Sequence, residues 1–155
     1  MSLRLAPEVT ANRRVAESDE TPPSSQILVD GAPAAVVSGA RLEAAVQCDG
    51  RFLLFMTDDT PFEEVLSIHL ISSDGRLLDS ATLGGPYTTG AFSDLSLHPP
   101  NHVGFRFIGE ADWSIEILPD PAFRLPLRAD APGIRRALGF SRHFVVHGKP
   151  TPAAR

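Results

Sequence analysis

The sequence predicts an all-β fold: an antiparallel β-sandwich or jelly-roll of about nine to eleven short strands, with at most one or two single-turn helices. The strongest observation is in residues 103–118, where two runs of alternating apolar side chains, Val103-Phe105-Phe107 and Trp113-Ile115-Ile117, flank a turn. Asp-Gly and Pro-rich turn signals recur along the rest of the chain, and no long segment keeps a helical period. A closed β-barrel is the alternative architecture.

The length of 155 residues suits one domain with its own core. Residues 1–25 mix charged residues and prolines without an apolar period, and we expect a flexible N-terminal arm there. Residues 26–147 carry the strand patterns and make up the single β-sandwich domain of this interpretation. Residues 148–155 are expected to form a flexible C-terminal tail.

The sequence pattern predicts three hairpins in the first half of the domain. Asp30-Gly31 separates two short apolar runs, and Asp49-Gly50 is a strong hairpin signal because a type I′ turn needs positive φ at both central residues. Residues 52–56 are apolar on both faces, which indicates a central strand covered on both sides. A third hairpin follows, with strands at 65–71 and 76–83.

The second half continues with a strand at 92–98, the hairpin of residues 103–118 and a last strand at 142–147. Pro119-Asp120-Pro121 is expected to end that hairpin, and Pro126 confines a strand at 124–128 to a sheet edge. Single helical turns are expected at 60–63 and within 130–139.

The net charge of −5 argues against a nucleic-acid binder. No signal-peptide core and no membrane-length apolar run are present, so we expect no membrane partner and a cytoplasmic location. Cys48 is the only cysteine, which excludes an intramolecular disulfide, and we interpret it as a small buried apolar residue.

The charge is distributed unevenly along the chain. Residues 122–155 hold seven basic residues and one acidic residue, a net charge of +6 that leaves −11 for residues 1–121. Arg135, Arg136 and Arg142 in this basic segment either dock on the protein's own acidic loops or present guanidinium groups to a protein partner.

Three residues are candidates for a small-molecule site at one end of the sandwich. His98 and His102 flank Pro99-Pro100-Asn101 and can converge across a tight loop; the alternative is two solvated loop histidines. Tyr87 lies in a glycine-rich loop, either as an exposed contact or as a plug over the end of the sandwich. His143 and His147 fall on one strand, where four residues span about 13 Å, too far for one zinc ion.

Acidic side chains cluster in the loop after residue 57. Asp58, Asp59, Glu63 and Glu64 are weak candidates for a Ca²⁺ site, but the spacing of an EF-hand is missing and a solvated acidic loop is the alternative. The sequence indicates neither a cofactor nor a metal centre.

The segments Phe105-Arg106-Phe107 and Ala111-Asp112-Trp113-Ser114-Ile115-Glu116-Ile117 resemble the last hairpin of bacterial jelly-roll-like β-sandwich accessory domains. The resemblance covers about a tenth of the chain. It implies a binding or adaptor role without catalysis.

Catalytic motifs are missing: the chain has no Gly-x-Ser-x-Gly elbow and no phosphate-binding loop. We therefore expect a non-catalytic β-sandwich module that binds a protein partner or self-associates. The first alternative is a small-molecule-binding protein or an enzyme that uses the mouth of a sandwich or barrel. The second is a structural subunit of a larger assembly, paired through the edge strand at 124–128.

Overall fold

The structure, a computed structural model, is all-β and contains three antiparallel sheets. It describes residues 2–16, 18, 21–59, 64–84, 90–108, 111–123, 130–131, 133–136 and 141–148. No helix occurs among these residues, and none of their three sheets closes into a barrel. The predicted sandwich-type fold is confirmed. The described residues form thirteen strands, more than expected, because the strands Leu3–Leu5, Val9–Arg13 and Arg135–Arg136 had not been predicted.

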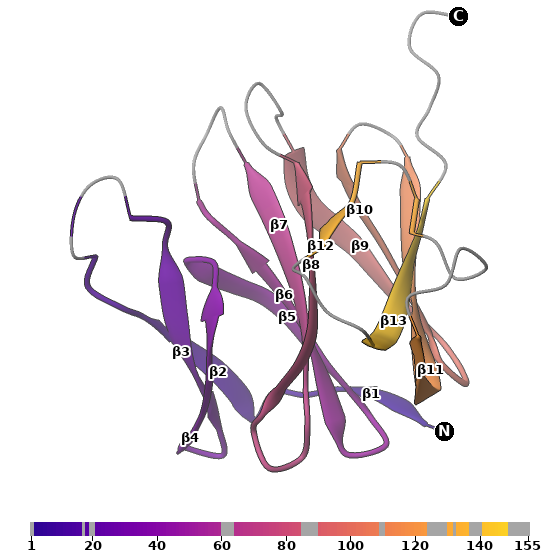
Figure 1. Ribbon diagram of the computed structural model, residues 1–155, viewed down its shortest axis with the longest axis horizontal. Coiled ribbons are helices and arrows are strands. Elements are labelled where there is room, and N and C mark those ends of the chain that lie inside the picture. Colours follow the sequence, from indigo (N-terminus) through magenta and orange to yellow (C-terminus); the bar gives the residue numbers. More distant parts are fainter. Residues whose placement is uncertain are drawn as a thin grey trace, which may run out of the picture.

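The strands form layers that are visible in Figure 1. The central sheet has six strands, in the order β1 (Leu3–Leu5), β5 (Arg41–Cys48), β6 (Arg51–Thr57), β7 (Val65–Ile71), β8 (Leu77–Gly84) and β12 (Arg135–Arg136). A four-stranded sheet has the order β13 (Ser141–Gly148), β11 (Asp112–Phe123), β10 (His102–Ile108) and β9 (Gly90–His98). A three-stranded sheet contains β2 (Val9–Arg13), β3 (Ser24–Val29) and β4 (Ala32–Ser38).

The central sheet is covered on both faces, and β6 shows why its sequence is apolar throughout. Leu53 and Phe55 belong to the core shared with the four-stranded sheet, whereas Phe52, Leu54 and Met56 belong to the core shared with the three-stranded sheet. Successive side chains of a strand point to opposite faces, so one uninterrupted apolar run serves both cores. The prediction of a central strand covered on both sides is confirmed.

The hairpin predicted at residues 103–118 is formed by β10 and β11. Val103 pairs with Ile115 and Phe105 with Trp113. All six alternating apolar side chains are buried in the core between the central and four-stranded sheets. Burial of each side chain of this size contributes roughly 1.5–3 kcal/mol to the stability of the fold. The hairpin therefore supplies much of the apolar face with which the four-stranded sheet packs on the central sheet.

The predicted Asp-Gly turns are also present. Asp49 and Gly50 have φ values of 50° and 77°, and Asp30 and Gly31 have 50° and 79°. Positive φ at both central positions is typical of the type I′ turn, whose twist matches that of the flanking strands. These turns join β5 to β6 and β3 to β4.

Three local expectations differ from the structure. The expected N-terminal arm contains β1 and β2, which pair with β5 and β3, respectively, because Ala6 and Val9 are buried against the central sheet. Pro119 does not end β11; the strand continues to Phe123, with an irregular register opposite β13 between Ile117 and Ala122 that accommodates residues lacking an N–H.

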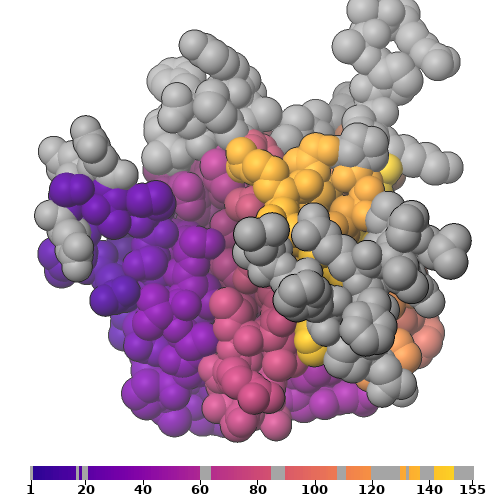
Figure 2. Space-filling view, viewed as in Figure 1, coloured from indigo at the N-terminus to yellow at the C-terminus, as the bar shows by residue number. Residues whose placement is uncertain are grey.

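The helical turn expected within 130–139 is replaced by β12, whose two arginines pair with Thr82 and Ala81 of β8. Figure 2 shows this side of the molecule, where β12 (orange) lies beside β8 (pink). The turn expected at 60–63 and the strand expected at 124–128 lie outside the described residues.

A polar cluster lies between the central and three-stranded sheets. The imidazole of His69 donates from Nε2 to the carbonyl oxygen of Ser38 at 3.0 Å, and its Nδ1 lies 2.7 Å from the hydroxyl of Ser80. His69 is 3% exposed, and burial lowers its pKa because the interior disfavours the charged ring. His69 lies on the face of β7 opposite to Ile68, which belongs to the main core, and it is buried because β4 of the three-stranded sheet covers that face.

Candidate functional site

The four-stranded sheet has a hollow on the face turned away from the core. In β10, Val103, Phe105 and Phe107 point into the core, so Gly104 and Arg106 lie on the opposite face. The hollow has a volume of about 360 Å³. Its lining residues come from three neighbouring strands: Asp94, Ser96, His98, Gly104, Phe105, Arg106, Asp112, Trp113 and Ser114.

The hollow exists because small residues are aligned across the three strands. Gly104 of β10 pairs with Ser96 of β9 on one side and with Ser114 of β11 on the other. A Cβ atom on Gly104 would lie 2.6 Å from Ser96 Oγ, so this row has no room for a larger side chain at its centre without a shift of Ser96. Glycine inside a strand is typical of places where another group approaches the backbone closely.

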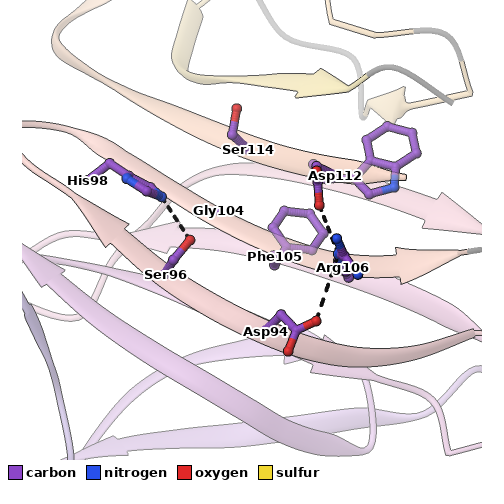
Figure 3. A pocket seen from close by; sticks show the side chains of 9 residues that line it. Asp94, Ser96, His98, Gly104, Phe105, Arg106, Asp112 and Ser114 are labelled. Carbon is purple, nitrogen blue, oxygen red and sulfur yellow. Dashed lines mark hydrogen bonds and ion pairs between the residues drawn. The ribbon is translucent and has the colours of Figure 1, made fainter. Parts of the chain in front are cut away.

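Polar side chains surround the row of small residues at the bottom of the hollow (Figure 3). Ser96 Oγ and His98 Nε2 share a hydrogen bond of 2.8 Å. The Nε of Arg106 donates to Asp112 at 2.8 Å and lies 3.8 Å from the carboxylate of Asp94. The side chains of Asp94 and Asp112 are 67% and 80% exposed, so their carboxylates remain accessible to a ligand as well as to Arg106.

The polar row continues toward one end of the same sheet. His102 is the cross-strand partner of both His98 and Glu116, so the two histidines named from the sequence are neighbours in the register of the sheet. His102 donates from Nδ1 to the side-chain oxygen of Asn101 at 3.1 Å. His147 of β13 lies 3.0 Å from Glu116, which extends the polar surface to the fourth strand.

The contact between Ser96 and His98 resembles a nucleophile and its base, but the rest of a triad is not assembled around it. In a serine hydrolase a third group orients the histidine through its other ring nitrogen. Among the described residues, the one side-chain hydrogen bond of His98 is that to Ser96. The lining is better suited to hold a polar molecule by hydrogen bonds than to activate a nucleophile.

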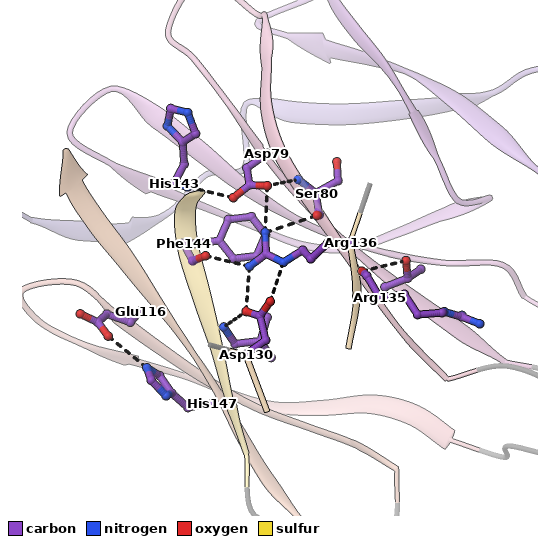
Figure 4. A network of polar contacts seen from close by, with 11 residues as sticks. Asp79, Ser80, Glu116, Asp130, Arg135, Arg136, His143, Phe144 and His147 are labelled. Carbon is purple, nitrogen blue, oxygen red and sulfur yellow. Dashed lines mark hydrogen bonds and ion pairs between the residues drawn. The ribbon is translucent and has the colours of Figure 1, made fainter. Parts of the chain in front are cut away.

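The basic residues singled out from the sequence lie elsewhere, and Arg136 is internal (Figure 4). Its guanidinium group is 2.8 Å from Asp79 and 2.9 Å from Asp130, and its side chain is 3% exposed. It also donates to the carbonyl oxygen of Phe144 at 2.7 Å and lies 4.4 Å from the centre of that ring. Arg136 is therefore bound inside the protein, by one carboxylate of β8 and one of its own basic segment, and neither belongs to an acidic loop.

The other two arginines differ from Arg136 and from each other. Arg135 is exposed, and its guanidinium group donates to the carbonyl oxygen of Gly84 at 2.7 Å. Arg142 is 7% exposed, which leaves little of it accessible to a partner. Of the three, Arg135 alone keeps an exposed side chain, because each of the others points into the structure.

The acidic loop is organised around the carboxylate of Glu64. One oxygen of Glu64 accepts hydrogen bonds from the backbone N–H groups of Asp58, Asp59 and Val65. Burial and the nearby Glu64 raise the pKa of Asp58. Within the described ranges no three His, Cys, Asp or Glu side chains are arranged to hold a metal ion. Glu63 and Tyr87, also predicted as candidates, lie outside the described residues.

Sequence reasoning found His98 but missed most of the hollow. Asp94, Ser96, Arg106, Asp112 and Ser114 occupy the polar positions of strands whose apolar positions had been assigned to the core. The signal that could have found them is Gly104, a glycine inside an alternating strand. Its cross-strand partners depend on the register between β9, β10 and β11, which a single run of residues does not specify.

Comparisons with models of protein families, with curated proteins and with solved structures gave no match. The resemblance of the closing hairpin to bacterial accessory domains stays a prediction. In the part of the chain that the structure describes, no helix has the length and apolarity needed to cross a bilayer.

Proposed function

We propose that this chain is a non-catalytic binding module that holds a small polar molecule in the hollow around Gly104. The proposal rests on the row of small residues that Ser96, Gly104 and Ser114 form across three neighbouring strands. Because these residues are small, the sheet surface has a depression there, bordered by charged and hydroxyl side chains. A volume of about 360 Å³ is within the range of small-molecule sites.

The polar groups converge on this floor from three strands of one sheet. Sites built on strands hold their side chains more precisely than sites on loops, because each backbone position is fixed by its neighbours. Ser96 and His98 approach from β9, Arg106 from β10, and Asp112 and Ser114 from β11. Such an arrangement favours recognition of one molecule over the broad, flat contact of a protein partner.

The placement of the basic segment also bears on the choice between partners. In the protein-partner alternative, Arg135, Arg136 and Arg142 would present their guanidinium groups to the partner. Because the guanidinium group of Arg136 forms ion pairs with Asp79 and Asp130 inside the protein, it is not available to a partner. We therefore place the small-molecule alternative ahead of the protein-partner alternative.

Saturation-transfer NMR with a library of small polar fragments tests this proposal. The library is grouped into neutral polyols, amines, carboxylates and zwitterions, and each group is screened against the wild-type chain and two variants. Gly104→Val fills the hollow, and Thr10→Val places the same side chain on an exposed position of β2, in a different sheet.

We expect at least one group of fragments to bind the wild-type chain and Thr10→Val, and to lose its signal with Gly104→Val. Fragments that bind Gly104→Val as well as the wild type would contradict the proposal, and so would a library without hits. Circular dichroism of all three proteins checks that the variants remain folded.

A further inference from the structure

We infer that the molecule held in the Gly104 hollow is a neutral, polyhydroxylated ring of the size of one monosaccharide or cyclitol. This inference rests on the proposed function, which it narrows to one chemical class. It follows from three properties of the hollow: the arrangement of its charges, the kinds of hydrogen-bonding groups it offers, and its size.

Arg106 offsets one of the two carboxylate charges of the hollow, which leaves these three groups with one negative charge in excess. Asp112 and Asp94 approach the same Nε atom of Arg106, at 2.8 Å and 3.8 Å. An anionic ligand would meet both carboxylates, and a cationic ligand would compete with Arg106 for them. A hydroxyl group donates one hydrogen bond and accepts others, so it can bind carboxylate and guanidinium together without separating the ion pair.

The neutral groups of the hollow have the same dual character. The hydroxyls of Ser96 and Ser114 and the imidazole of His98 each donate and accept hydrogen bonds. Ser96 and Ser114 lie on strands two apart, and two strand spacings amount to about 10 Å. A ring with hydroxyl groups on its rim can reach both sides of this row and Arg106 at once.

The floor and the size of the hollow limit the ligand to one ring. Gly104 supplies backbone without a side chain, and the apolar residues that contribute to the lining, Phe105 and Trp113, are 2% and 4% exposed. Binders of long polysaccharide chains stack sugar rings on exposed aromatic faces. With its aromatic residues buried, this hollow can contact the hydroxyl groups of a single ring and little more.

The experiment is a titration of ¹⁵N-labelled protein with four compounds that differ in charge. D-glucose and myo-inositol are neutral, D-glucosamine is cationic and D-glucuronate is anionic. We expect the neutral compounds to shift the backbone amide signals of residues 94–98, 104–106 and 112–114. Glucuronate should bind at least about threefold more weakly than glucose because it faces Asp94 and Asp112.

Asp112→Asn provides the second readout. The amide keeps the shape of the side chain but loses the charge-assisted bonds that the carboxylate makes with a hydroxyl group. We expect glucose to bind this variant about tenfold more weakly. Thr10→Val, far from the hollow, should bind glucose with wild-type affinity.

Three results would overturn the inference. Shifts of these amides by a charged compound and not by glucose or inositol would assign the hollow to another chemical class, and the proposed function would stand. If glucosamine bound more than about tenfold more tightly than glucose, the hollow would likewise be assigned to another chemical class, and the proposed function would stand. Neutral compounds that shift none of these amides, together with a fragment library without hits, would overturn the proposed function as well.

Discussion

The guanidinium group of Arg136 lies 2.8 Å from the carboxylate of Asp79, and both side chains are buried, with exposed fractions of 3% and 9%. Asp79 also accepts a hydrogen bond from the backbone N–H of His143, in the last strand, β13. Arg136 and its carboxylates therefore join the edge of the central sheet to the edge of the four-stranded sheet. This junction closes one side of the sandwich where no continuous hydrogen-bonded ladder does so.

Replacement of Arg136 by methionine should destabilise the protein strongly. The variant keeps most of the apolar volume but leaves Asp79 and Asp130 buried without their partner, which typically costs about 3–5 kcal/mol. Urea unfolding followed by tryptophan fluorescence measures the loss. Arg135→Gln is the matched control, because Arg135 is the neighbouring residue of β12 and is exposed; its effect should stay within about 0.5 kcal/mol. Equal effects of the two substitutions would show that the buried network does not stabilise the junction.

His69 should make the stability depend on pH. Burial lowers its pKa in the folded protein below the value of about 6.5 in the unfolded chain, so the unfolded chain binds more protons as the pH falls through this window. The contribution of the neutral ring is therefore complete above about pH 7 and is lost as the pH falls toward the folded-state pKa.

Comparison of the wild type with His69→Gln isolates this effect. At pH 8 the variant should be less stable by about 1–3 kcal/mol, because the hydrogen bonds to Ser38 and Ser80 are weakened. The difference should shrink as the pH is lowered to 5.5. His143, whose pKa burial also lowers, is present in both proteins and cancels in the comparison. Stability curves that run parallel between pH 8 and 5.5 would contradict this role of His69.

Two glycines with positive φ should respond differently to alanine. Gly84 has a φ of +102°, and an added Cβ would lie 2.5 Å from the backbone oxygen of Glu64 and 3.3 Å from the ring of Phe107. Gly31 has a φ of +79° with nothing within 4 Å. Gly31→Ala should cost about 1–2 kcal/mol from the left-handed backbone alone, and Gly84→Ala about 1–3 kcal/mol more. Thermal unfolding of both variants gives the comparison, and equal costs would mean that the contact with Glu64 relaxes freely.

The thiol of Cys48 should be protected in the folded protein. Its side chain is 0% exposed, and burial raises its pKa, which lowers the fraction of reactive thiolate. A thiol-specific reagent at pH 8 should label the native protein slowly and the urea-unfolded protein rapidly. Rapid and complete labelling without urea would show that this part of β5 opens readily.

The strands and turns that could be predicted from the sequence are those whose structure is determined by residues close together in the chain. The run Phe52 to Met56 indicated a strand buried on both faces, and the Asp49-Gly50 turn fixed the hairpin before it. The two N-terminal strands were missed because β1 and β2 are short and lie among charged residues and prolines. Their burial depends on contact with the central sheet, which local pattern does not reveal.

The candidate site depended on contacts between residues far apart in the chain. Arg136 and Asp79 are brought together by the pairing of β12 with β8, and from sequence Arg136 could equally have faced a partner. The hollow around Gly104 requires three small residues, one from each of three strands, to fall in register. Each of these residues by itself is an ordinary solvent-facing position of an alternating strand.

A map of the backbone amide signals that change when the strongest hit from the fragment screen is added tests the location of the binding site. We expect the largest changes in residues 94–98, 104–106 and 112–114 of the wild type, and we expect Gly104→Val to abolish them. Largest changes in the three-stranded sheet, or at the junction of β12 and β13, would place the binding site elsewhere and contradict the proposed function.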